Sequence, residues 1–510
     1  MKRRDFIKSS ILLSSLGSCI PSLLFGSKNR FSFRNSNIDS DKIVVLIKLN
    51  GGNDGLNTVI PFQNTSYYDQ RPSISIPSSE SLPITDSIAL HPSLENFQSL
   101  FLQQKMAIIQ GVGYVNGNLS HFRSSDIWDT GSDENVELST GWLGRLLELE
   151  YPDFPDNAPE HPLAIQFNSA NLLEFKTSIS NTGLYMYDPD TMYSIISGNY
   201  LENLNSDVPD THGGAELAFV RELDYMSFNY SQIISEAAQN APNTVATYPD
   251  TSIGTQLKIT SRLISGGLAT PFYRLYQNGY DTHVDQLSNH SQLLYNLSSS
   301  LNVFINEMES IGLLDRILIV TTSEFGRRSF ENASGGTDHG TSAPVFVFGS
   351  NINGGIFGNE PNLEQLDENN NLQVEFDFRQ VYTSILNDWF GINSQTIEQV
   401  FDRNFSKISF INSELTSSKN NLISDFKLYP VFPNPFNNKT TIRYKISSSN
   451  NISIILFNLQ GKELKRYNRG LQKTGIHNFT LDCKNLSSGN YLVKIESEKQ
   501  SLVQKISLVK

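Results

Sequence analysis

Short, almost continuous apolar runs recur along most of the chain. The clearest occupy residues 43–49, 106–109, 163–165, 317–320 and 344–348. A run of this kind is typical of a strand that is covered on both faces, as strands are in a parallel sheet. The sequence therefore predicts a buried sheet assembled from segments that lie far apart in the chain.

Between these runs, apolar residues recur at helical spacing, for example over residues 94–101 and, for about six turns, over residues 287–308. Buried strands that alternate with amphipathic helices predict an α/β domain, with a mainly parallel sheet flanked by helices, over residues 41–412. Such sheets carry their active sites at the carboxyl ends of the strands. Side chains that directly follow a predicted strand are therefore the first candidates for chemistry.

The pattern changes near the C-terminus. Residues 413–425 are polar and rich in Ser, Lys and Asn, which is typical of a linker. Over residues 426–510 apolar and polar side chains alternate, as at Ile442, Tyr444 and Ile446. This period of two predicts a compact all-β, immunoglobulin-like sandwich.

Four segments of this tail carry a further pattern: residues 429–437, 440–444, 454–461 and 486–491. Together they resemble the C-terminal sorting domain of the type nine secretion system of diderm bacteria. The resemblance implies transport across the outer membrane to the cell surface or the medium, with the outer-membrane secretion machinery as a partner. An exposed β module that binds sugar or protein is the alternative.

The N-terminus has the features of an export signal over residues 1–27. A pair of arginines precedes a short apolar, serine-rich stretch, residues 11–25. The arginines indicate a twin-arginine signal read by the export machinery, but Lys2 stands where that motif has Ser or Thr, so a general secretory signal stays open. Lipidation of Cys19 and an ordinary cut near residue 26 are alternative ways of processing it.

Composition narrows the range of partners. The 510 residues include 39 basic and 52 acidic side chains, for a formal net charge of -13. Such a chain has no surplus of Lys and Arg to displace counterions, which argues against nucleic acid or an anionic membrane as a partner. After the signal no apolar run approaches the ~18 residues of a membrane span, so no integral span is expected once the signal is removed. Cys483 is then the single cysteine, which leaves no internal disulfide.

The first candidate for chemistry lies where the first predicted strand ends, in residues 49–57. Glycines there allow a sharp turn beside Asp54. A carboxylate in this position could hold a metal. The alternative is that Asn, Asp and Gly serve only the backbone conformation of the turn.

The second candidate opens a predicted helix. Ser120 could cap this helix, whose first turn contains His121 and Arg123. Backbone N–H groups and the helix dipole favour an anion such as phosphate or sulfate there. Ser120 is the candidate nucleophile, Arg123 would hold the anion, and His121 would contact the substrate. A plain helix cap with a structural histidine is the alternative.

Further acidic and imidazole side chains follow predicted strands: Asp281, His283, Glu324, Asp338 and His339. Such groups at neighbouring strand ends are typical of a site for a divalent metal, which could be zinc, calcium or magnesium. Together with Asp54 in the turn after the first strand, these five residues form the predicted set of metal ligands. The alternative for the last pair is a flexible polar loop.

A set of motifs spread over residues 41–405 resembles one protein family. The motifs are residues 49–57, 120–122, 141–145, 280–283, 323–327, 337–340 and 377–382. They resemble an exported bacterial family, domain of unknown function 1501, whose members resemble alkaline phosphatases and sulfatases. This implies an alkaline-phosphatase-like fold with one or two metal sites. In that superfamily an Asp-His pair follows the late strand, whereas Glu324 and Phe325 stand here. Either one metal binds instead of two, or Asp338 and His339 reach in, or the site is degenerate.

Hypotheses from different classes follow from this resemblance. The first is a secreted metal-dependent hydrolase of phosphate or sulfate esters. The second is a non-catalytic surface protein that keeps the fold and binds a glycan or a protein partner, which Phe325 at a ligand position favours. A phosphomutase-like transferase is a third, and the scarcity of phosphorylated sugars outside the cell argues against it.

Overall fold

The computed structural model divides into two compact units, Met1–Ser413 and Glu414–Lys510. The residues that it describes are 38, 41–154, 158–167, 172–189, 230–241, 246–412, 426–428, 431, 434, 436–446, 449–458, 462–473, 475–497 and 501–510. The predicted export signal, with Cys19, and the predicted linker over residues 413–425 lie outside this part of the chain. Both therefore stay predictions.

Within the described residues of the larger unit, nine strands form one sheet. Their order is β13 (Gly355–Phe357), β5 (Met106–Gly113), β12 (Ala343–Phe348), β9 (Ile317–Thr322), β1 (Ile43–Asn50), β8 (Phe272–Asn278), β6 (Ala164–Gln166) and β7 (Gly183–Tyr185), and β14 (Phe376–Asp377) pairs with β5. These pairs are parallel except those that β12 makes with β5 and β9. The predicted mainly parallel sheet is therefore confirmed, with one reversed strand inside it.

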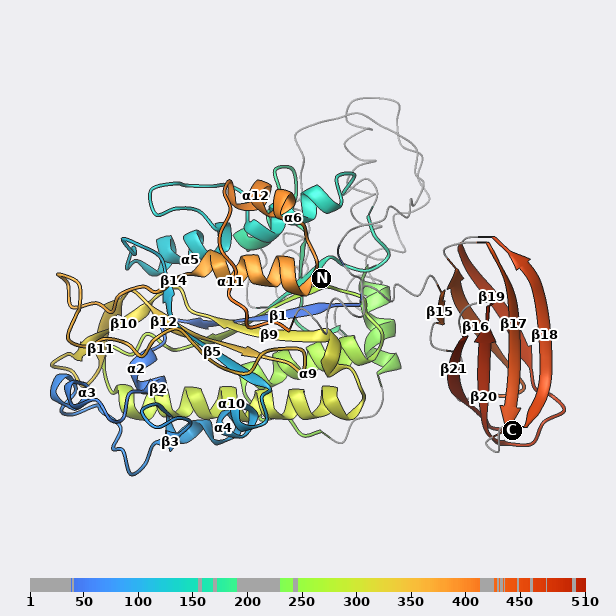
Figure 1. The fold of residues 1–510 in the computed structure, drawn as a ribbon, viewed down its shortest axis with the longest axis horizontal. Helices are drawn as coiled ribbons and strands as arrows, with labels where there is room; N and C mark the ends of the chain where they lie inside the picture. The colour runs from blue at the N-terminus through green and yellow to red at the C-terminus, as the bar shows by residue number, and fades with distance from the viewer. Residues whose placement is uncertain are drawn as a thin grey trace, which may run out of the picture. The chain divides into compact units, whose positions relative to one another are not determined.

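Helices cover both faces of this sheet (Figure 1). One layer contains α4 (Glu95–Leu102), α9 (Ser252–Ser265) and α10 (Gln286–Ser310), and the other contains α5 (His121–Thr130), α6 (Trp142–Glu150), α11 (Phe378–Ser384) and α12 (Ser394–Phe401). Alternate residues of β1 pack into the two layers, Val45 and Ile47 into the first, Val44 and Leu46 into the second. Burial on both faces explains why the strand reads as a continuous apolar run.

Short elements complete the larger unit. A hairpin of β10 (Gly326–Glu331) and β11 (Thr337–Gly340) separates β9 from β12, and α2 (Gly55–Thr58) directly follows β1. The others are α3 (Thr65–Gln70), a small sheet of β2 (Val59–Ile60), β4 (Ala89–Leu90) and β3 (Leu82–Pro83), 3-10 helices at Pro92–Leu94, Leu173–Phe175 and Leu314–Arg316, and a π-helix at Ile385–Trp389. No helix in the described part of the chain has the length and hydrophobicity that crossing a bilayer requires.

The smaller unit consists of two antiparallel sheets. One contains β15 (Phe426–Leu428), β16 (Lys439–Ile446) and β19 (Gly475–Asp482), and the other β18 (Glu463–Gln472), β17 (Asn450–Asn458), β20 (Gly489–Glu496) and β21 (Ser501–Leu508). Side chains from both sheets, including Ile442, Tyr444, Leu456 and Val493, share one core with the buried thiol of Cys483. This arrangement confirms the predicted all-β sandwich.

Candidate metal centre

Parallel strands end next to one another and bring together loops that are distant in sequence. β1 lies between β8 and β9, and its last residue, Asn50, pairs with Asn278 at the end of β8. Residues 51–54, 279–285 and 323–325 follow these strands and therefore meet at one edge of the sheet. The carboxyl edge of a parallel sheet is where α/β domains place their sites.

At this edge His121, Asp281 and His339 each offer one ligand atom, and these atoms lie within 4.8 Å of one another. The Nε2 atom of His339 is 3.2 Å from Oδ1 of Asp281, and the Nε2 atom of His121 is 3.4 Å from Oδ2 of the same carboxylate. The carboxylate thus lies between the two imidazoles. Such a set could hold a divalent cation after small side-chain shifts, since ligand bonds are about 2.0–2.3 Å long.

His283 adds a third imidazole to this group. Its Nε2 atom is 2.9 Å from Nε2 of His339 and 3.1 Å from Oδ1 of Asp281. Its other ring nitrogen, Nδ1, lies 3.4 Å from Oδ1 of Asp338. The carboxylate of Asp338 therefore faces the outer side of His283, where it could orient the ring but does not join the ligand atoms.

Glu324 holds His121 from behind. Its buried carboxylate accepts a hydrogen bond from Nδ1 of His121 at 2.9 Å and another from the backbone N–H of Gly51 at 2.8 Å. The bond to Glu324 raises the pKa of His121. In the neutral ring Nδ1 carries the proton and Nε2 offers a lone pair; this buried Nε2 atom makes no hydrogen bond among the described residues and faces the Asp281 carboxylate at 3.4 Å. A carboxylate behind a histidine is the usual arrangement at metal sites.

The backbone fixes the tautomer of His339 in the same way. Its Nδ1 atom is 2.8 Å from the carbonyl oxygen of Leu119, which can only accept, so Nδ1 carries the proton and the lone pair of Nε2 points toward Asp281 and His283. Burial has the largest effect on the pKa of His339 and lowers it. The neutral imidazole that this favours is the form that binds metals.

Arg327 ties the loops of the centre together, although the sequence marked it only as part of a motif. Its buried guanidinium donates to the carbonyl oxygens of Gly51, Gly52, Tyr280 and Thr337, and to Oδ1 of Asp281 at 2.7 Å. Burial acts to raise the pKa of Asp281, but the hydrogen bond and the charge of Arg327 outweigh it, and the pKa is lowered to about 2. Asp281 is therefore a carboxylate at neutral pH.

Phe325 forms one wall of the centre. Its ring is 2% exposed, and its centroid lies 4.9 Å from that of His121 and 4.5 Å from that of His339. An aromatic ring offers no donor atom to a cation. Of the outcomes that the sequence left open, this geometry favours a single cation, with His339 reaching in from the hairpin.

Asp54 does not join the cluster, which argues against its predicted role as a metal ligand. Its carboxylate is buried, pairs with Arg71 at 2.6 Å, accepts from Gln286 and caps α2 through the N–H groups of Leu56 and Asn57. Burial acts to raise the pKa of Asp54, but the charge and hydrogen bond of Arg71 outweigh it and lower the pKa. The glycine turn directs this side chain into the interior, away from the edge.

The predicted roles at the start of α5 also need correction. Nη2 of Arg123 donates to the carbonyl oxygens of Asp133, Glu134 and Val136, which ties this end of the guanidinium to the following loop and argues against its predicted role on an anion. His121, predicted to contact the substrate, has the geometry of a metal ligand. Ser120 is exposed and precedes α5, but its side chain makes no capping hydrogen bond. Its role as nucleophile stays a prediction.

Two family models match parts of the chain. Residues 201–401 match the model of a family described as "Protein of unknown function (DUF1501)". This match confirms the predicted family for that segment. Residues 430–509 match the "Secretion system C-terminal sorting domain". The protein is therefore secreted through the type nine system and sorted to the cell surface or the medium, whereas the type of its N-terminal signal stays a prediction.

Solved structures give more distant likenesses. An alkaline phosphatase superfamily protein from Vibrio parahaemolyticus is 10% identical, with 88% of this chain and 85% of that one covered and a TM-score of 0.34. The sulfatase PsFucS1 from Pseudoalteromonas sp. is 10% identical, with 96% and 90% covered and a TM-score of 0.30. PorZ, a type IX secretion component of Porphyromonas gingivalis, is 18% identical, with 16% of this chain and 11% of PorZ covered and a TM-score of 0.13. The comparison with curated proteins gives no match.

Proposed function

We propose that this secreted protein is a metal-dependent hydrolase of phosphate or sulfate esters. The observation that carries the proposal is the convergence of His121, Asp281 and His339 at the carboxyl edge of the sheet, with ligand atoms within 4.8 Å of one another. The Nε2 atom of His121 supports it, because this buried nitrogen makes no hydrogen bond among the described residues and lies 3.4 Å from the Asp281 carboxylate, where a bound cation would complete both groups.

Among zinc, calcium and magnesium, the donor set fits zinc best. Imidazole nitrogens of His121, His283 and His339 with one oxygen of Asp281 form a nitrogen-rich set of the kind that zinc prefers, whereas calcium and magnesium prefer oxygen. When bound, such an ion polarises the ester oxygen and lowers the pKa of a hydroxyl nucleophile. The ring of Phe325 beside these nitrogens supports one ion instead of two.

The residues of the chain have distinct tasks in this proposal. Arg327 holds Asp281 ionised and in place, and Glu324 keeps the proton of His121 on Nδ1. The first N–H groups of α5 have no partner within the helix and favour an anionic group beside His121. Ser120 precedes those groups in the chain and is the candidate nucleophile. These features together would orient an anionic ester against the metal centre.

The test combines metal analysis with turnover on the chain from residue 28 onward. Plasma-emission analysis is expected to find about one zinc per chain, and 4-nitrophenyl phosphate or sulfate is expected to be hydrolysed. Asp281→Asn and His339→Ala are expected to lose both, while His477→Ala in the sorting domain keeps both. A protein that binds no divalent metal when offered zinc in solution would remove the proposal.

A second candidate function is retained because of Phe325, which stands where the superfamily has a ligand. In this alternative the fold carries a degenerate site and binds a glycan or a protein partner without turnover. The two candidates separate cleanly in the same experiment. Stoichiometric zinc without hydrolysis of either ester class would favour the binding protein, and hydrolysis that depends on Asp281 would exclude it.

A further inference from the structure

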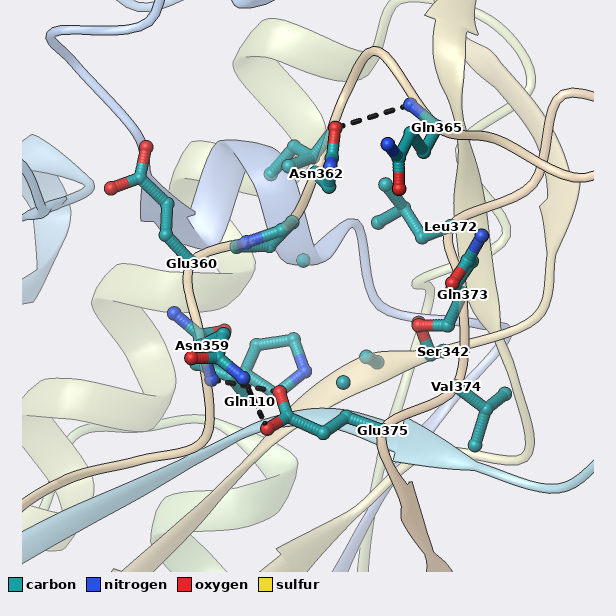
Figure 2. Close-up of a pocket in the computed structure, with 16 residues that line it drawn as sticks. Gln110, Ser342, Asn359, Glu360, Asn362, Gln365, Leu372, Gln373, Val374 and Glu375 are labelled. Atoms are coloured by element: carbon teal, nitrogen blue, oxygen red, sulfur yellow. Dashed lines mark hydrogen bonds between the residues drawn. The ribbon is translucent and has the colours of Figure 1, made fainter.

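A separate pocket lies beside the reversed strand of the sheet. Its volume is about 470 Å³, within the range of small-molecule sites, and sixteen residues line it. Gln110, Asn359 and Glu375 lie together at one end, and Asn362 and Gln365 at the other (Figure 2). None of the ligand atoms of the metal centre belongs to this lining.

A β-bulge opens the sheet at this place. β12 and β5 pair Ala343 with Val112 and Val345 with Ile109, so one residue of β12, Pro344, faces two residues of β5. Pro344 has no N–H to donate to the ladder. Of the two residues opposite, Gly111 takes a positive φ of 61°, and the bulge re-aims the side chain of Gln110.

Gln110 is the most telling residue of the lining. It is 2% exposed, yet its side-chain Nε2 has no hydrogen-bond partner among the described residues. A buried amide without a partner is unfavourable unless a ligand or water completes it. Rotation of the amide exchanges its donor and acceptor, so it can offer either group to a bound molecule.

The charge and polarity of the lining restrict the ligand. It contains no Lys, Arg or His and no aromatic ring, so nothing in it would neutralise a phosphate or sulfate group. Gln110, Asn359, Asn362, Gln365 and Gln373 supply amides that both donate and accept. Hydroxyl groups, which also donate and accept, are the complementary partners. The two carboxylates of the lining, Glu360 and Glu375, repel anions and accept hydrogen bonds from hydroxyls, so the lining suits a molecule without negative charge that carries many hydroxyls.

Of the two acidic groups in the lining, Glu360 and Glu375, the second is held in place by hydrogen bonds. The Glu375 carboxylate accepts from the backbone N–H of Asn359 at 2.7 Å and from its Nδ2 at 2.8 Å. The side-chain oxygen of Asn359 stays available as an acceptor, and the carboxylate of Glu375 keeps unused lone pairs. Preformed acceptors of this kind are typical of sites that orient a ligand with few polar contacts.

We propose that this pocket binds a neutral sugar unit of an oligosaccharide. The pocket and the metal centre share one connection, because Ser342 in the lining follows His339 by three residues, a span of at most about 11 Å between their Cα atoms. A glycan held in the pocket would thus lie near the centre. The proposal does not depend on catalysis, since a non-catalytic surface protein could use the same pocket.

Isothermal titration calorimetry on the chain from residue 28 tests the proposal with neutral hexasaccharides at millimolar concentration: malto-, cello-, laminari- and mannohexaose. At least one is expected to bind. Gln110→Leu is expected to weaken that binding about fivefold, the value of one neutral hydrogen bond. Gln365→Ala changes an exposed side chain that packing does not need, and it is expected to weaken binding as well.

Matched controls separate this site from the metal centre. Gln103→Leu, which changes an exposed glutamine outside the pocket lining, and His339→Ala are both expected to leave the dissociation constant unchanged. Failure of all four sugars to bind overturns the proposal, whatever the outcome of the zinc and ester assays. Binding that persists unchanged in both Gln110→Leu and Gln365→Ala overturns it too, because the sugar would then sit elsewhere.

Discussion

Glu324→Gln tests the metal centre without removing a ligand. The Glu324 carboxylate is buried and accepts from Nδ1 of His121 at 2.9 Å and from the N–H of Gly51 at 2.8 Å. Glutamine has the same shape but no charge, and its amide can present an N–H to a ring nitrogen that needs an acceptor. Loss of such a carboxylate behind a histidine typically weakens metal binding about 10–100-fold.

This change in affinity translates into stability. At saturating zinc each tenfold loss of affinity removes about 1.4 kcal/mol of the stabilisation that the ion provides, so Glu324→Gln is expected to lose about 1.4–2.7 kcal/mol of it. Competition with a chromophoric chelator would measure the dissociation constant, and urea unfolding with and without zinc would measure the stabilisation. Glu309→Gln is the control, since this exposed glutamate pairs with Lys105 on the surface.

The comparison between zinc-loaded and zinc-free protein decides the matter. A purely structural role for Glu324 would lower the free energy of unfolding equally in both forms and leave the dissociation constant unchanged. That result would refute the assignment of Glu324 as a positioning residue for His121. If Glu324→Gln leaves the dissociation constant for zinc unchanged while His339→Ala abolishes zinc binding, only the role of Glu324 would be wrong and the metal centre itself would stand.

Other predictions concern the buried ion pair and the sorting domain. Arg71→Met leaves the buried Asp54 carboxylate unpaired and should cost about 3–5 kcal/mol in urea unfolding, whereas a loss below 1 kcal/mol would contradict the ion pair. Because the folded pKa of Asp54 is lowered from 3.8, its contribution to stability is present above pH 3.8 and is lost as pH falls through the lower folded pKa. Arg71→Met should abolish this loss in unfolding titrations that extend from pH 7 to about pH 2. Removal of residues 426–510 should leave the protein inside the cell envelope, which fractionation and immunoblotting would show; surface display without the tail would contradict the sorting role.

The strands were accessible from sequence because burial on both faces leaves a local signal. The runs at residues 43–49 and 317–320 became adjacent strands, and parallel pairing carried the loops after them to one edge. Asp281, His283, Glu324 and the hairpin residue His339 could therefore be grouped without a structure. Residue type and position at a strand end carry that much information.

Side-chain direction was not accessible in the same way. Asp54 follows the first strand as a ligand would, yet the turn at Gly51 and Gly52, both with positive φ, directs it to Arg71 inside the protein. The identity of that partner, seventeen residues later, leaves no periodic signal. Likewise nothing in the order of residues shows that Arg123 satisfies the carbonyls of its own following loop, or that the strand after His339 runs in reverse.

Arg327 has a consequence for how the centre could be studied. Its guanidinium ties three chain segments together through carbonyl oxygens and Asp281. A chelated protein should accordingly keep the same loop spacing, and cobalt or cadmium could be loaded afterwards without refolding. Bound cobalt would then show an absorption spectrum that reports its coordination geometry, which zinc cannot do because it has no visible absorption. Lysine in place of Arg327 could not reach all of these acceptors, so this convenience would vanish with it.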